Sequence, residues 1–257
     1  MKVVTSAQEL PSACAFVPTM GALHAGHGSL FSIASRYSDD VVASIFVNPL
    51  QFENKEDLEK YPRTPDRDIE LAEKFGVTHL WLPRYEEIYP DNFPRLTAGP
   101  ISKLYEGASR AGHFDGVVTV VRRLFNLVKP KFAIFGEKDF QQLALIREIA
   151  GEVEIVAAPI IRESDGLAMS SRNIRLDENG RIAARIISQA LRESRSEQEL
   201  RAILASESEL TVDYADYIDE QTFLAPSEST QFTRAIVAGW INGVRLLDNM
   251  PVKSEAK

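Results

Sequence analysis

The amino-acid sequence predicts an α/β protein in which a parallel sheet with flanking helices is followed by a small α+β C-terminal domain. In the first two-thirds of the chain, short apolar runs alternate with amphipathic segments, which is typical of a parallel sheet covered by helices on both faces. After about residue 175, a long helix-like segment precedes three strand-like runs. Since 257 residues can bury one large core and a smaller one, we predict two domains, over residues 1–174 and 175–257.

The individual elements follow from the spacing of apolar residues. The expected strands of the parallel sheet are residues 13–17, 41–47, 78–82, 132–135 and 153–157, and the expected helices are 29–35, 65–75, 117–128 and 140–150. In the second domain, we expect a helical segment over 178–204 and strands over 214–218, 235–240 and 244–247. An open parallel sheet binds ligands at the carboxyl ends of its strands, so the polar residues that follow the strands are candidates for a site.

Composition and charge restrict the kind of partner. The chain has 29 Lys and Arg against 37 Asp and Glu, a formal net charge of −8, which leaves no broad basic face and favours small ligands over nucleic acid. No apolar run approaches the roughly 20 residues that span a bilayer, and the first residues lack the apolar core of a signal peptide. We therefore expect a cytoplasmic protein with no membrane partner. The single cysteine, Cys14, excludes an internal disulfide and a cysteine-based zinc site, and its apolar neighbours predict a buried thiol.

The segment from Pro18 to His27 joins the end of the first expected strand to a glycine-containing turn with two histidines. A helix N-terminus after this turn would attract anions through its unpaired N–H groups and its dipole. His24 and His27 add donors that can follow a developing phosphate charge. A single histidine in a turn is commonly a structural hydrogen-bonding group, but a pair directly after a strand favours phosphate binding. A zinc site on these histidines would need a third ligand nearby, and the sequence shows none.

Polar residues also follow the second strand and precede the most apolar helix. Asn48 and Gln51 offer neutral amide ligands at a strand end, and ordinary Asn-Pro turn chemistry is the alternative explanation. Arg110 and His113 place a cation and an imidazole on a glycine-containing loop near a helix N-terminus. Helix capping by Asp115 would explain that aspartate but neither Arg110 nor His113.

Two further segments place cations beside the expected ligand crevice. Lys138 and Asp139 stand at the turn after the fourth strand, where the ammonium is a point charge suited to phosphate and Asp139 alternatively caps the next helix. Residues 169–173 bring two hydroxyls, the guanidinium of Arg172 and an amide into five positions. Such clusters usually mark plain loops. Arg172 beside two hydroxyls can instead clamp a polyphosphate and neutralise charge that grows in a transition state.

Together these segments resemble the pantothenate synthetases, ATP-dependent ligases that join pantoate to β-alanine through a pantoyl-adenylate intermediate and release AMP and pyrophosphate. The matching blocks cover nearly the whole chain: residues 18–27, 46–52, 61–64, 113–117, 135–139, 169–173 and 247–249. The resemblance implies a nucleotidyltransferase-like Rossmann domain that binds the nucleotide and pantoate, and a small C-terminal lid domain that closes over the site. It also implies a homodimer and ATP bound with Mg²⁺.

The resemblance further implies roles for the matching positions. The residues implied to stabilise the transition state are His24, His27, Lys138 and Arg172. The implied ATP-binding residues are Pro18, Met20, Gly26, His27, Gly136, Lys138, Asp139, Met169, Ser170, Ser171 and Arg172. Pantoate and β-alanine are implied to contact Asn48, Gln51, Arg110, His113 and Gln142. Asp68 lies where the family places a carboxylate near the metal and the phosphates.

Three positions depart from the family's pattern. Gly28 stands where a leucine is common, Arg67 replaces an acidic residue before Asp68, and Ala111 replaces a proline. Arg67 bears on the metal site. Because glycine early in a helix costs up to about 1 kcal/mol relative to alanine, we expect Gly28→Leu to raise the melting temperature.

Two rival functions share the nucleotide-binding motifs. A related nucleotidyltransferase that acts on another acid is expected to lack the pair Gln51 and Gln142. A catalytically silent nucleotide-binding regulator would not need both histidines together with Lys138 and Arg172.

Overall fold

The computed structural model describes residues 1–52 and 55–252 and divides into two compact units. The first unit contains Met1–Glu137 and Gln141–Pro159, and the second contains Lys138–Phe140 and the chain from Ile160 onward. A three-residue turn that follows a strand of the first unit thus groups with the C-terminal part of the chain. The domain boundary predicted after residue 174 stays a prediction.

The first unit is built on a six-stranded parallel sheet with the order β1-β4-β3-β2-β5-β6. Its strands are β1 (Lys2–Val4), β2 (Ala15–Thr19), β3 (Val41–Ile45), β4 (His79–Trp81), β5 (Phe132–Gly136) and β6 (Glu154–Ala158). The predicted parallel sheet is confirmed, and the ends of the five expected strands differ from the observed ends by at most two residues. The short edge strand β1 was not predicted, because three residues are too few to show a periodic pattern.

The direction of strand addition reverses beside β2. From β2 the chain runs outward through β3 to β4, and it then returns to place β5 on the other side of β2. Ala15 of β2 pairs with Val41 on one side and with Phe132 on the other. The carboxyl ends of β2 and β5 therefore lie at the switch point, where sheets of this class bind their ligands.

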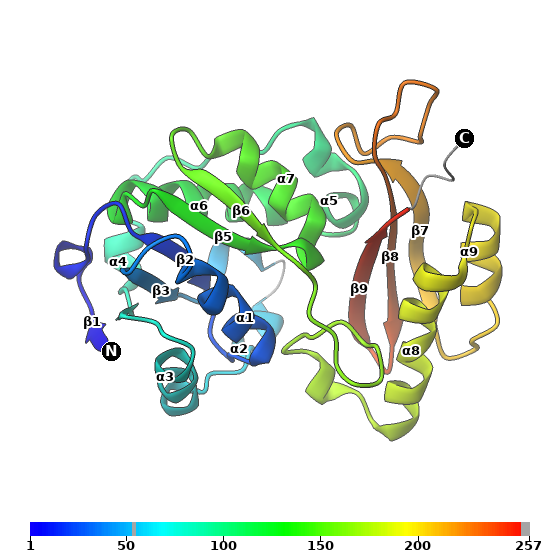
Figure 1. Cartoon of the computed structure of the whole chain (residues 1–257), viewed down its shortest axis with the longest axis horizontal. Helices are drawn as coiled ribbons and strands as arrows, with labels where there is room; N and C mark the ends of the chain where they lie inside the picture. The colour runs from blue at the N-terminus through cyan, green and yellow to red at the C-terminus, as the bar shows by residue number, and fades with distance from the viewer. Residues whose placement is uncertain (53–54, 253–257) are drawn as a thin grey trace. The chain divides into compact units, whose positions relative to one another are not determined.

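Helices cover both faces of this sheet, with α1 and α3 on one face and α6 and α7 on the other (Figure 1). The longer helices are α1 (Ala25–Ala34), α3 (Pro65–Lys74), α6 (His113–Val128) and α7 (Phe140–Ile149). The shorter elements are α2 (Lys55–Glu59), α4 (Tyr85–Ile88), α5 (Tyr105–Ser109) and the 3₁₀ turns η1 (Ala7–Glu9), η2 (Pro49–Gln51), η3 (Pro100–Lys103) and η4 (Glu137–Asp139). Val17, Ala43 and Ile134 of the central strands are fully buried, so these strands carry continuous apolar runs.

Two helices begin earlier than predicted, and the change places two candidate histidines inside them. The side chain of His24 caps α1, so this helix starts at the next residue and His27 lies in its first turn. Helix α6 starts at His113, directly after Gly112, whose φ of +76° is left-handed and suits glycine.

Gly28 is buried in α1 against the ring of Phe75. A Cβ at position 28 would lie 2.6–2.7 Å from three atoms of that ring, and real Cβ atoms do not approach closer than about 3.0 Å. The expectation that leucine stabilises this position is therefore wrong, because the ring of Phe75 fills the space that a larger residue needs.

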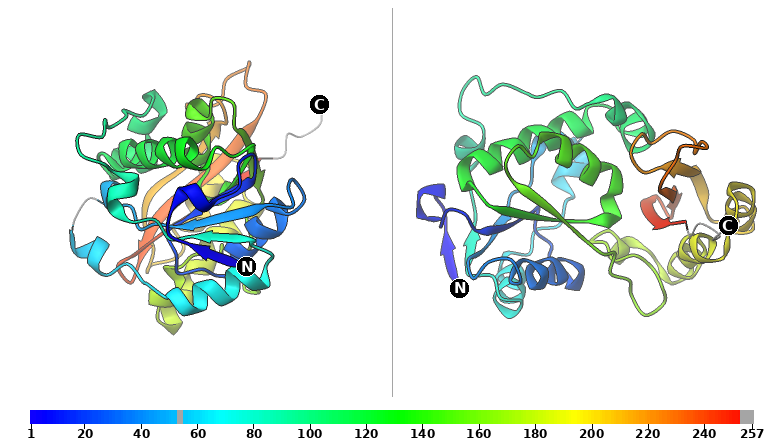
Figure 2. Two further views of the ribbon diagram at one scale, coloured as in Figure 1. Left: turned by 90° about the vertical axis from the view of Figure 1, so that its left-hand side faces the viewer. Right: turned by 45° about the horizontal axis from the view of Figure 1, so that its top comes forward.

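The second unit is built on a three-stranded antiparallel sheet with the order β7 (Thr211–Asp219), β8 (Thr233–Ile241), β9 (Val244–Pro251). Helices α8 (Glu178–Glu193) and α9 (Glu197–Leu204) pack against this sheet, after the 3₁₀ turn η5 (Asn173–Arg175) (Figure 2). The helical segment predicted over 178–204 is divided, because Ser196 accepts a hydrogen bond from Glu199 N and starts α9. Within residues 1–52 and 55–252, no helix combines the length and apolar character needed to cross a membrane.

Candidate active site

His24 and His27 together form the N-terminal cap of α1. Gly26 N donates to His24 Nδ1 (3.1 Å), and His24 N donates to His27 Nδ1 (3.3 Å). In a neutral imidazole one nitrogen accepts a hydrogen bond and the other carries the hydrogen. Since Nδ1 is the acceptor in both residues, Nε2 carries the hydrogen in both. The two ring centroids are 4.2 Å apart. The cap thus places two N–H donors together at a helix N-terminus, where an anion is stabilised.

Asp68, implied to lie near a metal, holds the loop that leads into α1. Its carboxylate accepts hydrogen bonds from Ala22 N (3.0 Å), Leu23 N (2.7 Å) and Thr64 Oγ1 (3.0 Å), and Asp68 is only 2% exposed. A buried carboxylate occupied by three protein donors does not fit the role of a metal ligand. Throughout the described ranges, no group of three or more His, Cys, Asp or Glu side chains is arranged to hold a metal ion. Asp68 therefore positions the histidine-bearing loop.

Asn48 and Gln51 lie after the carboxyl end of β3, around η2. The buried Asn48 donates from Nδ2 to Gln51 Oε1 (3.0 Å) and to Gly116 O (3.1 Å). Its Oδ1 accepts from Leu50 N (3.2 Å). Gln51 Nε2 in turn lies 2.9 Å from Met20 Sδ, so residues that follow β2 and β3 meet here. The structure thus brings Met20, Asn48 and Gln51 together.

Arg110 and His113 support Gln51 from its backbone side. His113 Nδ1 lies 2.8 Å from Gln51 O and must donate to this carbonyl, which leaves Nε2 to accept from Arg110 Nη1 at 3.0 Å. Arg110 Nη1 also lies 3.8 Å from Glu106 Oε2. Since His113 is buried and both its nitrogens contact protein groups, its contacts position Gln51 and Arg110.

The adjacent glutamines of α7 have different environments. Gln141 is buried, with Oε1 accepting from Glu106 N (3.0 Å) and Nε2 donating to Ile101 O and Leu104 O (both 2.8 Å). Gln142, the predicted ligand, is half-buried. The spacing of apolar residues in the sequence does not show which of two adjacent glutamines is structural. Burial and hydrogen bonding in the folded protein do show it.

The other predicted residues of the first unit lie near the switch point. Pro18 is in β2, Gly26 is in the first turn of α1, and Gly136 ends β5. Arg67, the departure beside Asp68, is exposed on α3. Its side chain is therefore not enclosed with the carboxylate of Asp68.

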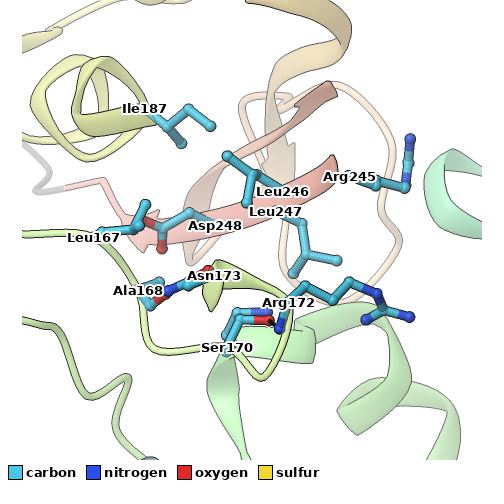
Figure 3. Close-up of a pocket in the computed structure, with 11 residues that line it drawn as sticks. Leu167, Ala168, Ser170, Arg172, Asn173, Ile187, Arg245, Leu246, Leu247 and Asp248 are labelled. Carbon is cyan, nitrogen blue, oxygen red and sulfur yellow. Dashed lines mark hydrogen bonds between the residues drawn. The ribbon is translucent and has the colours of Figure 1, made fainter. Parts of the chain in front are cut away.

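In the second unit, three predicted phosphate-binding residues line one pocket. Lys138, Ser170 and Arg172 share its wall with Arg245 of β9. The space within this pocket, including the part that is open to solvent, is about 360 Å³. Its other lining residues are Leu167, Ala168, Asn173, Ile187, Leu246, Leu247 and Asp248 (Figure 3). Lys138 and Arg172, two cationic groups, and the Ser170 hydroxyl suit a phosphate-bearing ligand, whereas the guanidinium of Arg245 pairs with Asp213 (2.7 Å).

Two asparagines of this unit were given no specific role by the sequence, although Asn173 belongs to the block at 169–173. Asn173 lines the pocket, and its buried Oδ1 has no hydrogen-bond partner within the described part of the chain. Asn249 Nδ2 donates to Lys138 O (2.9 Å), and Arg234 Nη1 donates to Asn249 Oδ1 (2.6 Å). Arg234 also lies 3.9 Å from the ring centroid of Phe140. These contacts explain why the turn that carries Lys138 groups with the C-terminal unit.

The remaining predicted residues of this unit are more accessible. Asp139 is exposed, and Met169 and Ser171 are half-buried in the chain before η5. The sequence block at 247–249 was the only signal for Asn249, and it gave no role.

Comparisons with known proteins agree with this geometry. The family model described as pantoate-beta-alanine ligase matches residues 1–251. The pantothenate synthetase of Acidothermus cellulolyticus is 45% identical, covering 93% of this chain and 85% of that protein. The solved pantothenate synthetase of Thermus thermophilus matches with a TM-score of 0.94 at 42% identity, covering 99% of this chain and 100% of that one. The pantoate-beta-alanine ligase of Francisella tularensis, complexed with beta-gamma ATP and beta-alanine, matches with a TM-score of 0.85 at 33% identity, covering 99% and 98%. The chain therefore belongs to the pantoate-beta-alanine ligase family.

Proposed function

We propose that this protein catalyses the ATP-dependent condensation of pantoate with β-alanine, giving pantothenate, AMP and pyrophosphate through a pantoyl adenylate. Membership of the pantoate-beta-alanine ligase family supports this function. The observation that carries it is the cap of α1, where His24 and His27 both hold a protonated Nε2 at a helix N-terminus. This arrangement suits the charge that develops during transfer of an adenylyl group.

In the first step, a carboxylate oxygen of pantoate attacks the α-phosphorus of ATP, and the bond from this phosphorus to the pyrophosphate oxygen breaks. Two anions meet, so the protein neutralises charge and aligns the groups, and it needs no nucleophile of its own. His24 and His27 donate from Nε2 to phosphate oxygens. Lys138 and Arg172, which line one pocket, stabilise the departing pyrophosphate.

Pantoate is held by the amides of Gln51 and Gln142, which hydrogen-bond its hydroxyl and carboxylate groups. Asn48 and His113 support Gln51 through the contacts described above. Arg110 borders the β-alanine side of the pocket. Substrate binding therefore depends on a small number of neutral donors, whose orientation matters more than their charge.

In the second step, the amine of β-alanine attacks the carbonyl carbon of pantoyl adenylate. A C–N bond forms, the bond to the AMP oxygen breaks with its electron pair, and the nitrogen releases a proton to solvent. Water competes with the amine for the same carbon, so a closed site protects the intermediate. We assign this closing role to the C-terminal domain.

The proposal includes Mg²⁺ bound to ATP as its counter-ion. Asp68 is not assigned as a ligand of this ion, because its carboxylate already accepts three hydrogen bonds from the protein. Chelation of Mg²⁺ should stop AMP formation. A homodimer and a cytoplasmic location complete the proposal and are supported by the resemblance to the family. Sedimentation equilibrium measures the oligomeric state.

The function is tested by measuring AMP formation with ATP, Mg²⁺, pantoate and β-alanine, each omitted in turn. Sustained AMP formation should require all four. Pantoate without β-alanine should support exchange of labelled pyrophosphate into ATP, because adenylation is complete before the amine is needed. Exchange that depends strictly on β-alanine would reject the two-step mechanism. Turnover with another acid but not with pantoate would indicate the related nucleotidyltransferase, and no turnover would indicate the regulator.

Single-turnover kinetics test the catalytic residues. Alanine at His24, His27 or Lys138 should lower the adenylation rate by at least about 100-fold, on the order of 3 kcal/mol. The variant His24→Asn is the matched control for the helix cap, since asparagine caps helices well but lacks an imidazole Nε2. It should melt like the wild type and still adenylate slowly. Near wild-type rates in the alanine variants would remove these residues from the mechanism.

A further inference from the structure

Tyr89 is a buried tyrosine for which neither the sequence motifs nor the reaction requires a role. It directly follows α4, is 8% exposed, and packs among three aromatic rings. Its ring centroid lies 5.4 Å from that of Tyr85, 5.8 Å from Phe93 and 6.0 Å from Phe46. Its hydroxyl donates to Asn48 Oδ1 at 2.8 Å. The tyrosine thus ends a polar chain that leads to the candidate site.

The orientation of the Asn48 amide is set by backbone groups. Leu50 N can only donate, so the atom it reaches at 3.2 Å must be Oδ1. Gly116 O can only accept, so the atom 3.1 Å from it must be Nδ2. Asn48 is 1% exposed. If its amide were rotated by 180°, Leu50 N would face the donor Nδ2 and Gly116 O would face the acceptor Oδ1, so neither backbone group would have a hydrogen bond. Tyr89 supplies the second donor to Oδ1 and so fills the acceptor capacity of this oxygen.

The orientation of Asn48 then decides the orientation of Gln51. Asn48 Nδ2 is a donor, so the Gln51 atom 3.0 Å away must be the acceptor Oε1. Gln51 therefore turns its Nε2 toward Met20 Sδ, at 2.9 Å. A thioether is a weak acceptor, so an oxygen of a ligand can compete for this N–H group. Gln51 is half-buried, whereas Asn48 and Tyr89 are enclosed.

We propose that Tyr89 is a positioning residue that holds the Gln51 amide, through Asn48, so that Nε2 is presented to an oxygen of pantoate. This proposal rests on the proposed function, which makes Gln51 a ligand of pantoate. In this proposal, the specificity of the subsite comes from the N–H group of Gln51 Nε2, which requires a substrate oxygen that accepts a hydrogen bond. Burial raises the pKa of Tyr89 well above its usual value, so the hydroxyl remains protonated and able to donate at the pH of an assay.

The test is a double-mutant cycle between Tyr89→Phe and Gln51→Ala, read as kcat/KM for pantoate. Tyr89→Phe removes the hydroxyl and keeps the ring in its aromatic cluster. We expect a five- to tenfold loss, mainly through a higher KM, with the KM for ATP unchanged within about twofold. Gln51→Ala should lose at least about 20-fold. In the Gln51→Ala background, Tyr89→Phe should have no further effect, because the group that it positions is gone.

Tyr85→Phe is the matched control. It removes a hydroxyl from the same aromatic cluster, since the ring centroids of Tyr85 and Tyr89 are 5.4 Å apart. Tyr85 is 48% exposed, whereas Tyr89 is buried. Its kcat/KM for pantoate should equal that of the wild type. Melting temperatures of all variants are measured in parallel, so that a folding defect is seen directly.

The outcomes separate the proposal from the function on which it rests. Wild-type turnover with pantoate tests the function, and Gln51→Ala tests the ligand. If both behave as expected while Tyr89→Phe has wild-type kinetics, the positioning role is overturned, whether or not the variant melts earlier. Equal losses from Tyr89→Phe with and without Gln51 would also overturn it, because Tyr89 would then act by another route. A Gln51→Ala variant with wild-type kinetics would overturn the proposal together with the assigned pantoate subsite.

Discussion

Substitution of Gly116 by alanine tests whether the close packing of α6 on η2 sets the position of Gln51. Gly116 lies in the first turn of α6, and a Cβ there would lie 2.2 Å from Leu50 O and 2.8 Å from Gln51 N. Real Cβ atoms do not approach closer than about 3.0 Å, so one of the two elements must move by about 0.8 Å. Both of these neighbours are backbone atoms, so rotation of a side chain cannot relieve the contact.

The size of this displacement sets the expected effect. A misplacement near 1 Å of a group that positions substrate can lower the rate by about 100-fold, or about 2.7 kcal/mol. The hydrogen bond from Asn48 Nδ2 to Gly116 O joins the same elements, so the movement also reaches Gln51 through Asn48. We therefore expect Gly116→Ala to lower kcat/KM for pantoate by about 10- to 100-fold. The KM for ATP should change less, because His24 caps α1 and His27 lies in its first turn, outside α6 and η2, one of which must move.

The assay is steady-state AMP formation with pantoate varied at saturating ATP and β-alanine. Val121→Ala controls for lost stability, since Val121 is buried in the same helix and its truncation leaves a cavity without crowding η2. This control should lower the melting temperature and keep kcat/KM for pantoate. A Gly116→Ala variant with wild-type kcat/KM would refute the reasoning, because the backbone contact would then not determine where Gln51 lies.

Three further predictions concern stability. Gly28→Leu should lower the melting temperature, and the added change Phe75→Leu should restore it by emptying the crowded space, whereas a single variant that melts higher would contradict the 2.6 Å contact. Asp248→Ala should lower the free energy of unfolding, measured in urea, by about 3 kcal/mol, because the Arg162 guanidinium, which donates to both carboxylate oxygens of Asp248, loses its partner. A decrease under about 1 kcal/mol would show that water compensates for the lost ion pair. Burial raises the pKa of the Cys14 thiol from 9.0 to about 12. The unfolded chain therefore loses this proton first, and the free energy of unfolding should fall as the pH rises from about 9 toward 12, relative to a Cys14→Ala control that lacks the effect.

The sequence by itself determined the class of fold and the segments that carry the site. Continuous apolar runs specify strands buried on both faces, and they predicted five strands of the parallel sheet to within two residues. The same pattern predicted that the candidate site residues follow the carboxyl ends of the strands, since polar residues directly after a buried strand must leave the core. These properties are local, so spacing and composition are enough to read them.

Only the tertiary structure shows which polar side chains form hydrogen bonds within the protein and which remain able to bind a ligand. The family resemblance implies that Asp68 lies near a metal, but its carboxylate accepts from Leu23 N, 45 residues away, and Asp68 is buried. Lys138 O accepts from Asn249 across 111 residues, and Tyr89 reaches Asn48 across 41. A hydrogen bond between residues so far apart leaves no period and no spacing in the chain. It exists only once folding brings the two groups within about 3 Å, because burial without a partner would cost each of them about 1–3 kcal/mol.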